Sequence, residues 1–277
     1  MLTPVPQIAI IIRTYSRIMD TEALIHLIQS RWTRLSYTIF VVHNGEKDGH
    51  HVTDFIKSNA VYVSVDENKG HIEGAKSLVQ AGLKAASSLG GFTHYLLIES
   101  DFWLLDDALV ERTIHRMEST RSSLATTIWV ENKRTLAVDF FIAEANFLHS
   151  HPELLDWDEH PEHYMREFLS DIPICVINEL RPAHLPNILR KLHHSIRVVD
   201  GGRFRIFPKA PALTHHIETL DQDPAKGLAI KKGLANALAK EKIFSDADDV
   251  PLPSGLFWQK WARYVPQSWW YKRWLKR

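Results

Sequence analysis

Short runs of β-branched residues alternate with amphipathic stretches through the first hundred residues, a pattern that few folds accommodate. The predicted strands are residues 8–13, 38–43, 61–65 and 95–99, and the helices between them are 21–32 and 72–87. These strands are continuously apolar, as in sheets that are buried on both faces. The sequence therefore predicts an α/β fold with a mostly parallel, Rossmann-like sheet flanked by helices. Ligands of such sheets bind at the carboxyl ends of the strands.

The order of elements becomes less regular after Asp101. Further helices are predicted at 107–119, 162–169 and 224–242, and further strands at 125–130, 139–143, 174–178, 203–208 and 212–216. At 277 residues and 45% hydrophobic, the chain can bury one large core. We expect a catalytic domain at 1–244, followed by a linker and a tail at 245–277.

The net charge, the single cysteine and the first residues of the chain indicate which ligands and which cellular compartment to expect. The formal net charge is zero, so the whole-chain balance gives no sign of binding to nucleic acid. Cys175 is alone and cannot form an internal disulfide; its apolar neighbours predict a buried strand and a reducing compartment. The first residues lack the pattern of a secretory signal, so we expect a cytoplasmic protein.

An apolar strand runs directly into two acids at Glu99-Ser100-Asp101. Residues i and i+2 of an extended segment point the same way, so both carboxylates can face one ligand. Hard carboxylate oxygens at a strand end suit Mn²⁺ or Mg²⁺. The alternative is that Asp101 caps the next helix and Glu99 is solvated.

Several segments together resemble family-2-like glycosyltransferases of the GT-A fold. They are Ile10-Ile11-Ile12-Arg13-Thr14-Tyr15-Ser16-Arg17, Val41-Val42-His43-Asn44-Gly45 with Asp48, Glu67-Asn68-Lys69-Gly70 with Gly74-Ala75-Lys76, and Glu99-Ser100-Asp101. The last stands in the place of the family's Asp-x-Asp metal motif. The resemblance spans about residues 8 to 216 and implies transfer of a sugar from a nucleoside diphosphate, assisted by Mn²⁺ or Mg²⁺.

The resemblance also implies roles for individual residues. Thr14 and Tyr15 would hold the base and ribose, Asp101 would be the main metal ligand, and Glu99 would reach the ribose or a metal-bound water. Glu stands where the commonest form has Asp, which puts direct metal contact by Glu99 in doubt. The remaining residues expected at the nucleotide are Arg17, Asn44, Lys69, Gly70 and Lys76. For the two lysines, the alternative is a solvated surface charge.

Two further regions are expected to complete the site. His215 or His216, at the end of a late predicted strand, would supply a histidine to the metal. An inverting transfer needs a carboxylate that takes the proton of the acceptor hydroxyl. Glu162, or else Glu159, lies in an acid-rich helix start that resembles the acceptor-side motif of the family. The alternative is a surface helix in which Glu162 pairs with Arg166.

The tail combines aromatic and basic residues. Residues 254–277 hold five of the nine tryptophans, six basic residues and no acid. This composition predicts an anchor at a membrane surface and hence a membrane-linked glycan or lipid as acceptor, with the enzyme peripheral on the cytoplasmic face. The alternative is that the tryptophans pack on the domain. Nothing else in the chain supports nucleic-acid binding.

Two rival functions stay open. A sugar-phosphate nucleotidyltransferase could use a related sheet and metal, but its usual glycine-rich loop is missing from Arg13-Thr14-Tyr15-Ser16-Arg17. A non-catalytic carbohydrate-binding protein could keep the fold without turnover.

Overall fold

The computed structural model describes residues 6–130, 135–157, 161–169, 171–180, 204–207, 210–215 and 224–247. The chain divides into two compact units, Met1–Asn178 and Glu179–Arg277. The boundary expected after residue 244 stays a prediction, and residues 248–277, which include most of the tail, lie outside the described ranges.

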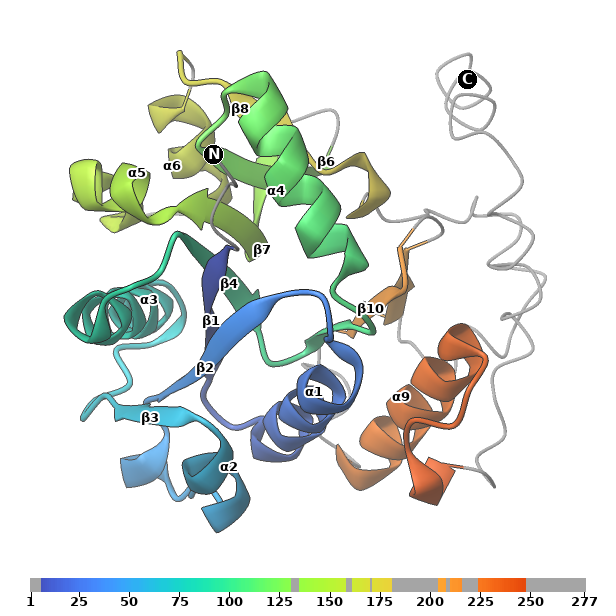
Figure 1. Cartoon of the computed structure of the whole chain (residues 1–277). Helices are drawn as coiled ribbons and strands as arrows, with labels where there is room; N and C mark the ends of the chain where they lie inside the picture. The colour runs from blue at the N-terminus through green and yellow to red at the C-terminus, as the bar shows by residue number, and fades with distance from the viewer. Residues whose placement is uncertain are drawn as a thin grey trace, which may run out of the picture. The chain divides into compact units, whose positions relative to one another are not determined.

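A seven-stranded sheet forms the centre of the first unit (Figure 1). Its strands are β1 (Gln7–Thr14), β2 (Ser36–His43), β3 (Val61–Ser64), β4 (His94–Glu99), β6 (Leu124–Val130), β7 (Thr135–Glu144) and β8 (Ile174–Val176). They lie in the order β3-β2-β1-β4-β7-β6-β8. The first four are parallel, β7 is antiparallel to both β4 and β6, and β8 is parallel to β6. The predicted mostly parallel sheet is confirmed. A short β5 (Phe102–Leu104) follows β4.

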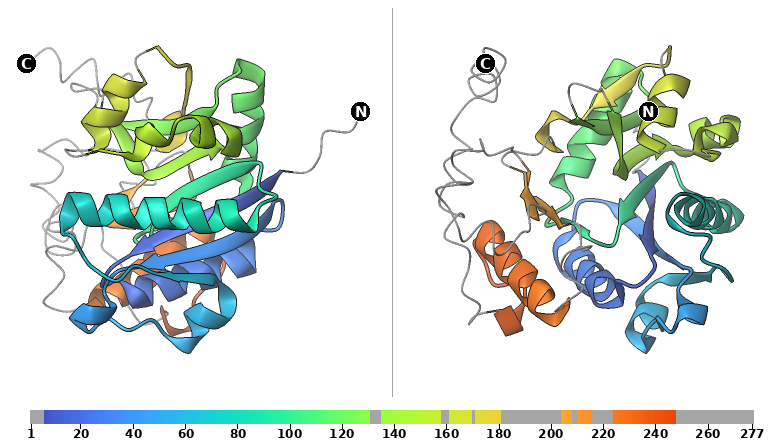
Figure 2. Two further views of the ribbon diagram at one scale, coloured as in Figure 1. Left: turned by 90° about the vertical axis from the view of Figure 1, so that its left-hand side faces the viewer. Right: turned by 180° about the vertical axis from the view of Figure 1, so that it is seen from behind.

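Helices cover both faces of this sheet (Figures 1 and 2). One face carries α1 (Ile18–Arg31) and α4 (Ala108–Thr120), and the other carries α3 (His71–Leu89), α5 (Ala145–Ser150) and α6 (Pro161–Phe168). A short helix, α2 (Asp54–Asn59), precedes β3 and has Thr53 as its N-cap. Because both faces are covered, the central strands are buried along almost their whole length. Cys175 is buried in β8, as expected.

Gly82 lets α3 approach the sheet closely. A Cβ atom at this position would lie 2.5 Å from Ile11 Cγ2 and 2.8 Å from Val42 Cγ2, both on buried strands. There is no room for even one methyl group, so helix and strands would have to separate.

We therefore expect Gly82→Ala to destabilise the protein, against the usual gain in helix propensity. Overpacking a tight core costs about 1–3 kcal/mol, which exceeds the ~1 kcal/mol that alanine gains over glycine in a helix. Chemical denaturation of the variant measures the change in unfolding free energy. Lys84→Ala, at an exposed position of the same helix, is the matched control and should stay within about 0.5 kcal/mol of the parent. An unchanged or higher stability of Gly82→Ala would contradict this packing.

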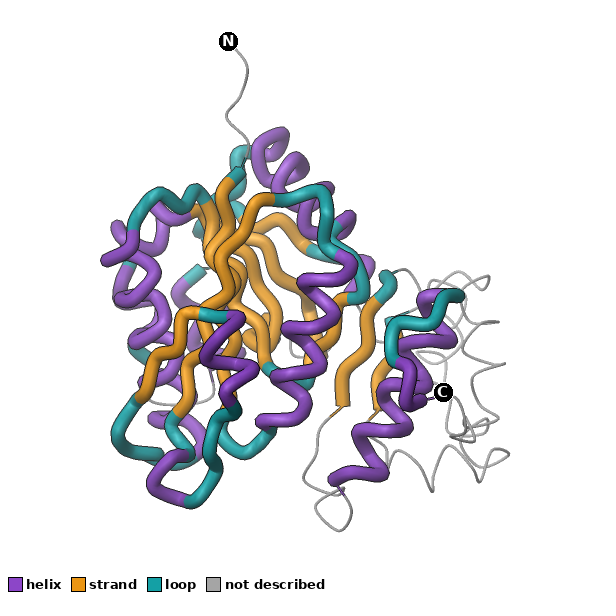
Figure 3. The backbone as a smooth tube through the Cα atoms, turned by 60° about the horizontal axis from the view of Figure 1, so that its bottom comes forward, coloured by secondary structure: helices purple, strands orange, loops and turns teal. Residues whose placement is uncertain are grey.

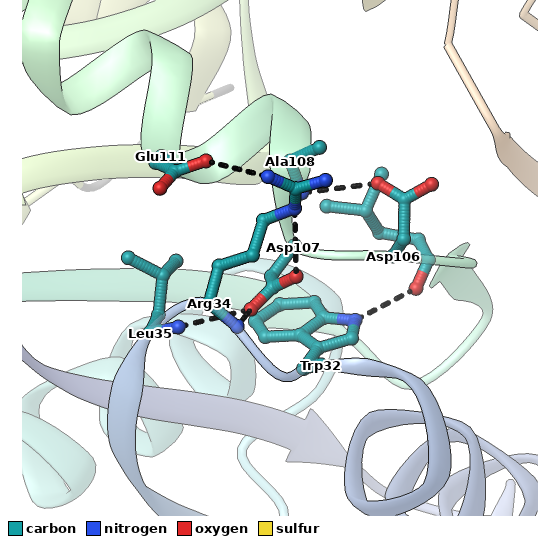
Figure 4. Close-up of polar contacts among 8 residues, drawn as sticks. Trp32, Arg34, Leu35, Asp106, Asp107, Ala108 and Glu111 are labelled. Atoms are coloured by element: carbon teal, nitrogen blue, oxygen red, sulfur yellow. Dashed lines mark hydrogen bonds and ion pairs between the residues drawn. The ribbon is translucent and has the colours of Figure 1, made fainter.

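A buried carboxylate fixes the connection between α1 and β2 (Figure 4). Asp107 is 1% exposed, and its Oδ2 accepts hydrogen bonds from the backbone N–H groups of Arg34 (2.6 Å) and Leu35 (3.0 Å). The Arg34 guanidinium lies 4.0 Å from Asp107 and 3.4 Å from Glu111. The start of α4 is thereby tied to the turn before β2. Asp107 therefore has a structural role.

The described part of the second unit contains two strands, one α-helix and a 3₁₀ turn. Strands β9 (Phe204–Ile206) and β10 (Ala212–His215) pair antiparallel, and α9 runs over Pro224–Ala239. The helix predicted to reach residue 242 ends earlier, because Lys240 takes a left-handed conformation at φ 61°. Asn236 Oδ1 then accepts hydrogen bonds from the backbone of Ile243 and Phe244. Residues 245–247, expected as the start of a linker, form a 3₁₀ turn. Among the helices of the described ranges, none is long and apolar enough to cross a membrane.

Candidate functional site

The carboxyl ends of β1, β2 and β4 meet at one edge of the sheet, where Figure 3 shows the strands side by side. Thr14 lies opposite His43 on β2, and Arg13 lies opposite Glu99 on β4. The segments that follow these strands are the ones expected to bind a nucleotide and a metal. The strand register thus brings three of the predicted segments together.

The turns after β1 and β2 are packed tightly against each other. His43 is fully buried, with Nε2 2.9 Å from the carbonyl oxygen of Tyr15 and 3.2 Å from the backbone nitrogen of Gly45. Burial lowers the pKa of His43, so the ring is neutral at pH 7. A Cβ on Gly45 would lie 2.5 Å from Tyr15 O and 2.8 Å from His43 Nε2, so only glycine fits there.

This packing presents the Tyr15 ring at the surface of the edge. The ring is 36% exposed, stands edge-on to His50 at 4.8 Å, and its hydroxyl donates to Asp48 Oδ2 at 3.0 Å. An exposed aromatic ring held by two neighbours can contact a base or a ribose. Beside it, the Thr14 hydroxyl oxygen is buried and, among the described residues, has no hydrogen-bond partner.

Asn44 joins the loop before α3 to the same edge. Its Nδ2 lies 3.5 Å from Asn68 Oδ1, which also accepts from the backbone of Gly70 at 3.0 Å. Gly70 has φ 85°, and a Cβ on Gly74 would lie 2.8 Å from Asn68 Oδ1, so both positions favour glycine. Within the described part of the chain, Asn44 Oδ1 is buried without a hydrogen-bond partner. A ligand N–H could satisfy this acceptor.

The two lysines predicted at the diphosphate are placed differently. Lys69 is exposed in the loop beside Gly70. Lys76 is half-buried on α3, and its Nζ lies 2.9 Å from Glu73 and 3.4 Å from Asp156. The structure thus places Lys76 against two carboxylates of its own chain, a contact that sequence reasoning missed.

The acids at the end of β4 are both paired with arginines. Arg13 Nη2 donates to Glu99 Oε1 at 2.7 Å and to the backbone oxygen of Val138 at 3.0 Å. Arg17 Nη1 forms an ion pair with Asp101 Oδ2. The Asp101 side chain is 2% exposed and that of Glu99 is 35% exposed. Asp101 is therefore the enclosed acid of the motif and Glu99 the accessible one.

A third carboxyl group, Asp139, belongs to the same cluster and was not foreseen as a site residue. Ile98 pairs with Phe140, which places Asp139 one step further along, at the level of Glu99. Burial raises the pKa of Asp139 well above its ordinary value, and the charges of Glu99 and Asp101 raise it further. A signal was present in the sequence, because one acid interrupts the apolar run from Leu136 to Ala143.

We expect Asp139→Asn to raise the melting temperature at pH 7.5 when metal is removed with EDTA. The folded-state pKa lies above the unfolded value of about 3.9, so the unfolded chain loses its proton first as the pH rises. Stability from the neutral carboxyl is complete below pH ~4 and is lost as pH rises toward the folded-state pKa. Asparagine stays neutral at every pH, so the melting temperature of Asp139→Asn should exceed that of the parent by an amount that grows with pH. Each kcal/mol of stability gained corresponds to about 2–4 °C.

Melting curves of the two proteins between pH 4.5 and 8 measure this difference. Asp66→Asn, at an exposed acid on the loop after β3, is the control and should change little at any pH. A constant difference between Asp139→Asn and the parent across this range would show that Asp139 is ionised in the folded protein.

The donor atoms at the end of β4 match the chemistry of a hard divalent cation. Three carboxyl groups gather there, close enough for Glu99 and Asp101 to raise the pKa of Asp139. Carboxylate oxygens are the ligands that Mn²⁺ and Mg²⁺ prefer. Among the described residues, no three His, Cys, Asp or Glu side chains are already arranged to hold a metal ion, so phosphate oxygens of a ligand would have to complete the coordination. Asp101 and Glu99 would hold such an ion.

For four of the predicted site residues, the described structure does not include the side chain. Glu162 lies in α6 and His215 at the end of β10, but the structure describes their backbone alone. Glu159 and His216 lie outside the described residues. Their roles stay predictions.

The chain has a limited similarity to known proteins. No family model matches the chain, and no curated protein matches it. Among solved structures, S. aureus TarS 1-349 is similar over 63% of this chain at 13% identity and a TM-score of 0.46. A 4-diphosphocytidyl-2C-methyl-D-erythritol synthase from Anaerococcus prevotii is similar over 62% at 14% identity and a TM-score of 0.42. The chain spans 59% of the TarS chain and 86% of the synthase.

The architecture itself decides the fold assignment. Four parallel strands are followed by a reversed β7, helices cover both faces, and an acidic turn follows β4. The first unit therefore has the mostly parallel, Rossmann-like α/β fold that the sequence predicts.

Proposed function

We propose that this chain is a glycosyltransferase that moves a sugar from a nucleoside diphosphate to an acceptor hydroxyl. One observation carries the proposal. The exposed Tyr15 ring, the buried Asn44 acceptor and the acids Glu99 and Asp101 follow neighbouring strands at one sheet edge. A nucleoside and the diphosphate attached to it need a polar cradle and a cation site side by side.

Within this site different residues would bind different parts of the nucleotide sugar. Tyr15 and Asp48 would hold the ribose and base at the rim, with Asn44 Oδ1 accepting a hydrogen bond from the ligand. Glu99 and Asp101 would hold Mn²⁺ or Mg²⁺, which when bound neutralises negative charge on the leaving diphosphate. Lys69 stands beside the N-terminus of α3, where a phosphate would be favoured.

The transfer itself is a displacement at the anomeric carbon. The acceptor oxygen forms a bond to that carbon as the bond to the diphosphate oxygen breaks, which inverts the configuration. A carboxylate of this chain takes the acceptor proton, and Glu162, or else Glu159, is assigned that role.

The composition of the tail supports a membrane-linked glycan or lipid as the acceptor, with the chain peripheral on the cytoplasmic face. Tryptophan rings favour the headgroup region, and basic residues are attracted to anionic lipid. Binding to vesicles should rise with anionic lipid and fall only partly in high salt. Replacing Trp269, Trp270 and Trp274 by serine should weaken it. Equal binding by this variant, or unfolding of the variant, would count against the anchor.

A thermal-shift screen of nucleoside diphosphates with and without Mn²⁺ tests the core of the proposal. A ligand that binds only the folded state adds about 2.7 kcal/mol to the free energy of unfolding when its concentration is a hundred times its Kd. The melting temperature rises accordingly. A shift that needs both Mn²⁺ and one nucleoside diphosphate supports the site. Absence of any shift across all bases would overturn it.

Turnover assays separate the rival functions. Mn²⁺-dependent release of nucleoside diphosphate from a nucleotide sugar indicates a glycosyltransferase. Release of pyrophosphate from a nucleoside triphosphate and a sugar phosphate would instead indicate a nucleotidyltransferase. Binding without either reaction would indicate a carbohydrate-binding protein.

A further inference from the structure

The two arginines at the end of β4 hold their acids in different ways. Arg13 lies within β1, is 5% exposed, and bonds to β4 through Glu99 and to β7 through the backbone of Val138. It is a fixed part of the sheet. Arg17 instead precedes α1, with a non-helical backbone at φ −90° and ψ 52°.

Arg17 lies outside the strands of the sheet, in the segment between β1 and α1. Its side chain is 23% exposed, whereas that of its partner Asp101 is 2% exposed. A rotation of the Arg17 side chain toward solvent breaks no strand pairing. The partly exposed guanidinium is thus paired with an enclosed carboxylate.

The ion pair occupies the Oδ2 atom of Asp101 with a positive charge from the chain itself. A guanidinium is protonated at all ordinary pH values, and the ion pair joins that of Arg17 to Asp101. The guanidinium is thus a permanent positive charge beside Asp101. Any other cation that binds Asp101 Oδ2 must take the place of this ion pair.

We propose that Arg17 is a built-in cation on Asp101 that competes with the divalent metal and sets the metal affinity of the site. This inference rests on the metal site of the proposed function. Metal alone must break the Arg17–Asp101 ion pair without compensation. A nucleoside diphosphate that arrives with the metal offers phosphate oxygens to the released guanidinium. Metal and nucleotide therefore bind cooperatively, and Arg17 couples them.

Titration of the full chain with Mn²⁺ alone, followed by electron paramagnetic resonance, tests this competition. Arg17→Gln should bind Mn²⁺ about tenfold more tightly than the parent, a difference of about 1.4 kcal/mol in binding free energy. Arg17→Lys keeps the charge but loses the planar fork, and it should fall between the two. Arg34→Gln removes an arginine from the ion pairs with Asp107 and Glu111, away from this edge, and should leave the Mn²⁺ affinity unchanged.

The cooperative part of the inference has its own measurement. The same titrations are repeated with saturating UDP, or with whichever nucleoside diphosphate the thermal-shift screen selects. The gain in Mn²⁺ affinity that the nucleotide provides should be smaller in Arg17→Gln than in the parent. Melting curves of every variant establish that it is folded, and if Arg17→Gln is not, Arg17→Lys against the parent decides.

Failure of this inference can be told apart from failure of the metal site. If the parent binds Mn²⁺ and Arg17→Gln binds it equally or more weakly, Arg17 does not compete and the inference is overturned while the metal site stands. If neither the parent nor Arg17→Gln binds Mn²⁺ with or without nucleotide, both are overturned.

Discussion

Replacing Asp101 by asparagine is expected to abolish metal-dependent binding of a nucleoside diphosphate. Asp101 is the most enclosed acid at the end of β4, and a neutral amide is a much poorer ligand than a carboxylate for a hard divalent cation. Calorimetric titration with Mn²⁺ and nucleotide should show no binding where the parent binds. Glu99→Asp should be tolerated, because it keeps a carboxylate at the accessible position.

The ion pair with Arg17 requires a second control for this variant. Asp101→Asn leaves the partly buried guanidinium without its main partner, which can lower stability. The double variant Asp101→Asn/Arg17→Gln removes both charges and should recover the melting temperature while still failing to bind metal. Metal-dependent nucleotide binding by either protein would remove Asp101 from the site.

The second large effect is expected at α6. Glu162→Gln should lower turnover on the order of 10²-fold or more, the range for a lost general base, while donor binding stays nearly unchanged. Steady-state kinetics with nucleotide sugar and acceptor, together with a separate donor titration, measure the two quantities. Glu167→Gln is the matched control, because Glu167 is an exposed acid on the same helix.

The pattern across the acidic segment identifies the base. If Glu159→Gln loses turnover and Glu162→Gln does not, the assignment within the motif was wrong. Should both variants keep full turnover, the proton acceptor lies elsewhere in the chain.

The fold of the first unit could be read from the sequence largely because its central strands are buried on both faces. Continuous apolar runs such as residues 8–13 and 95–99 then mark the strands directly, and the structure extends each by a residue or two. Elements of few residues were missed, namely α2, α5 and β5. A six-residue helix offers too few turns for an apolar periodicity to show.

Only some of the residues of the candidate site could be predicted from the sequence. Tyr15, Asn44, Glu99 and Asp101 were expected together because they follow neighbouring strands, and the register places them at one edge. The cations and the third acid were not foreseen as a cluster, because their contacts join residues far apart in the chain. Arg13 meets Glu99 across 86 positions and Val138 across 125. The available signals were a charge at the end of an apolar run, Arg13, and a charge inside one, Asp139.

The reach of Arg13 to Val138 has a consequence for the order of folding. Strands β1 to β4 can assemble from the first hundred residues, but the guanidinium of Arg13 is fixed only when β7 docks against β4. Contacts of such long sequence separation form late, because the intervening chain must first be ordered. A chain in which β7 has not docked therefore lacks both the Arg13–Val138 contact and the Asp139 carboxyl group at this edge.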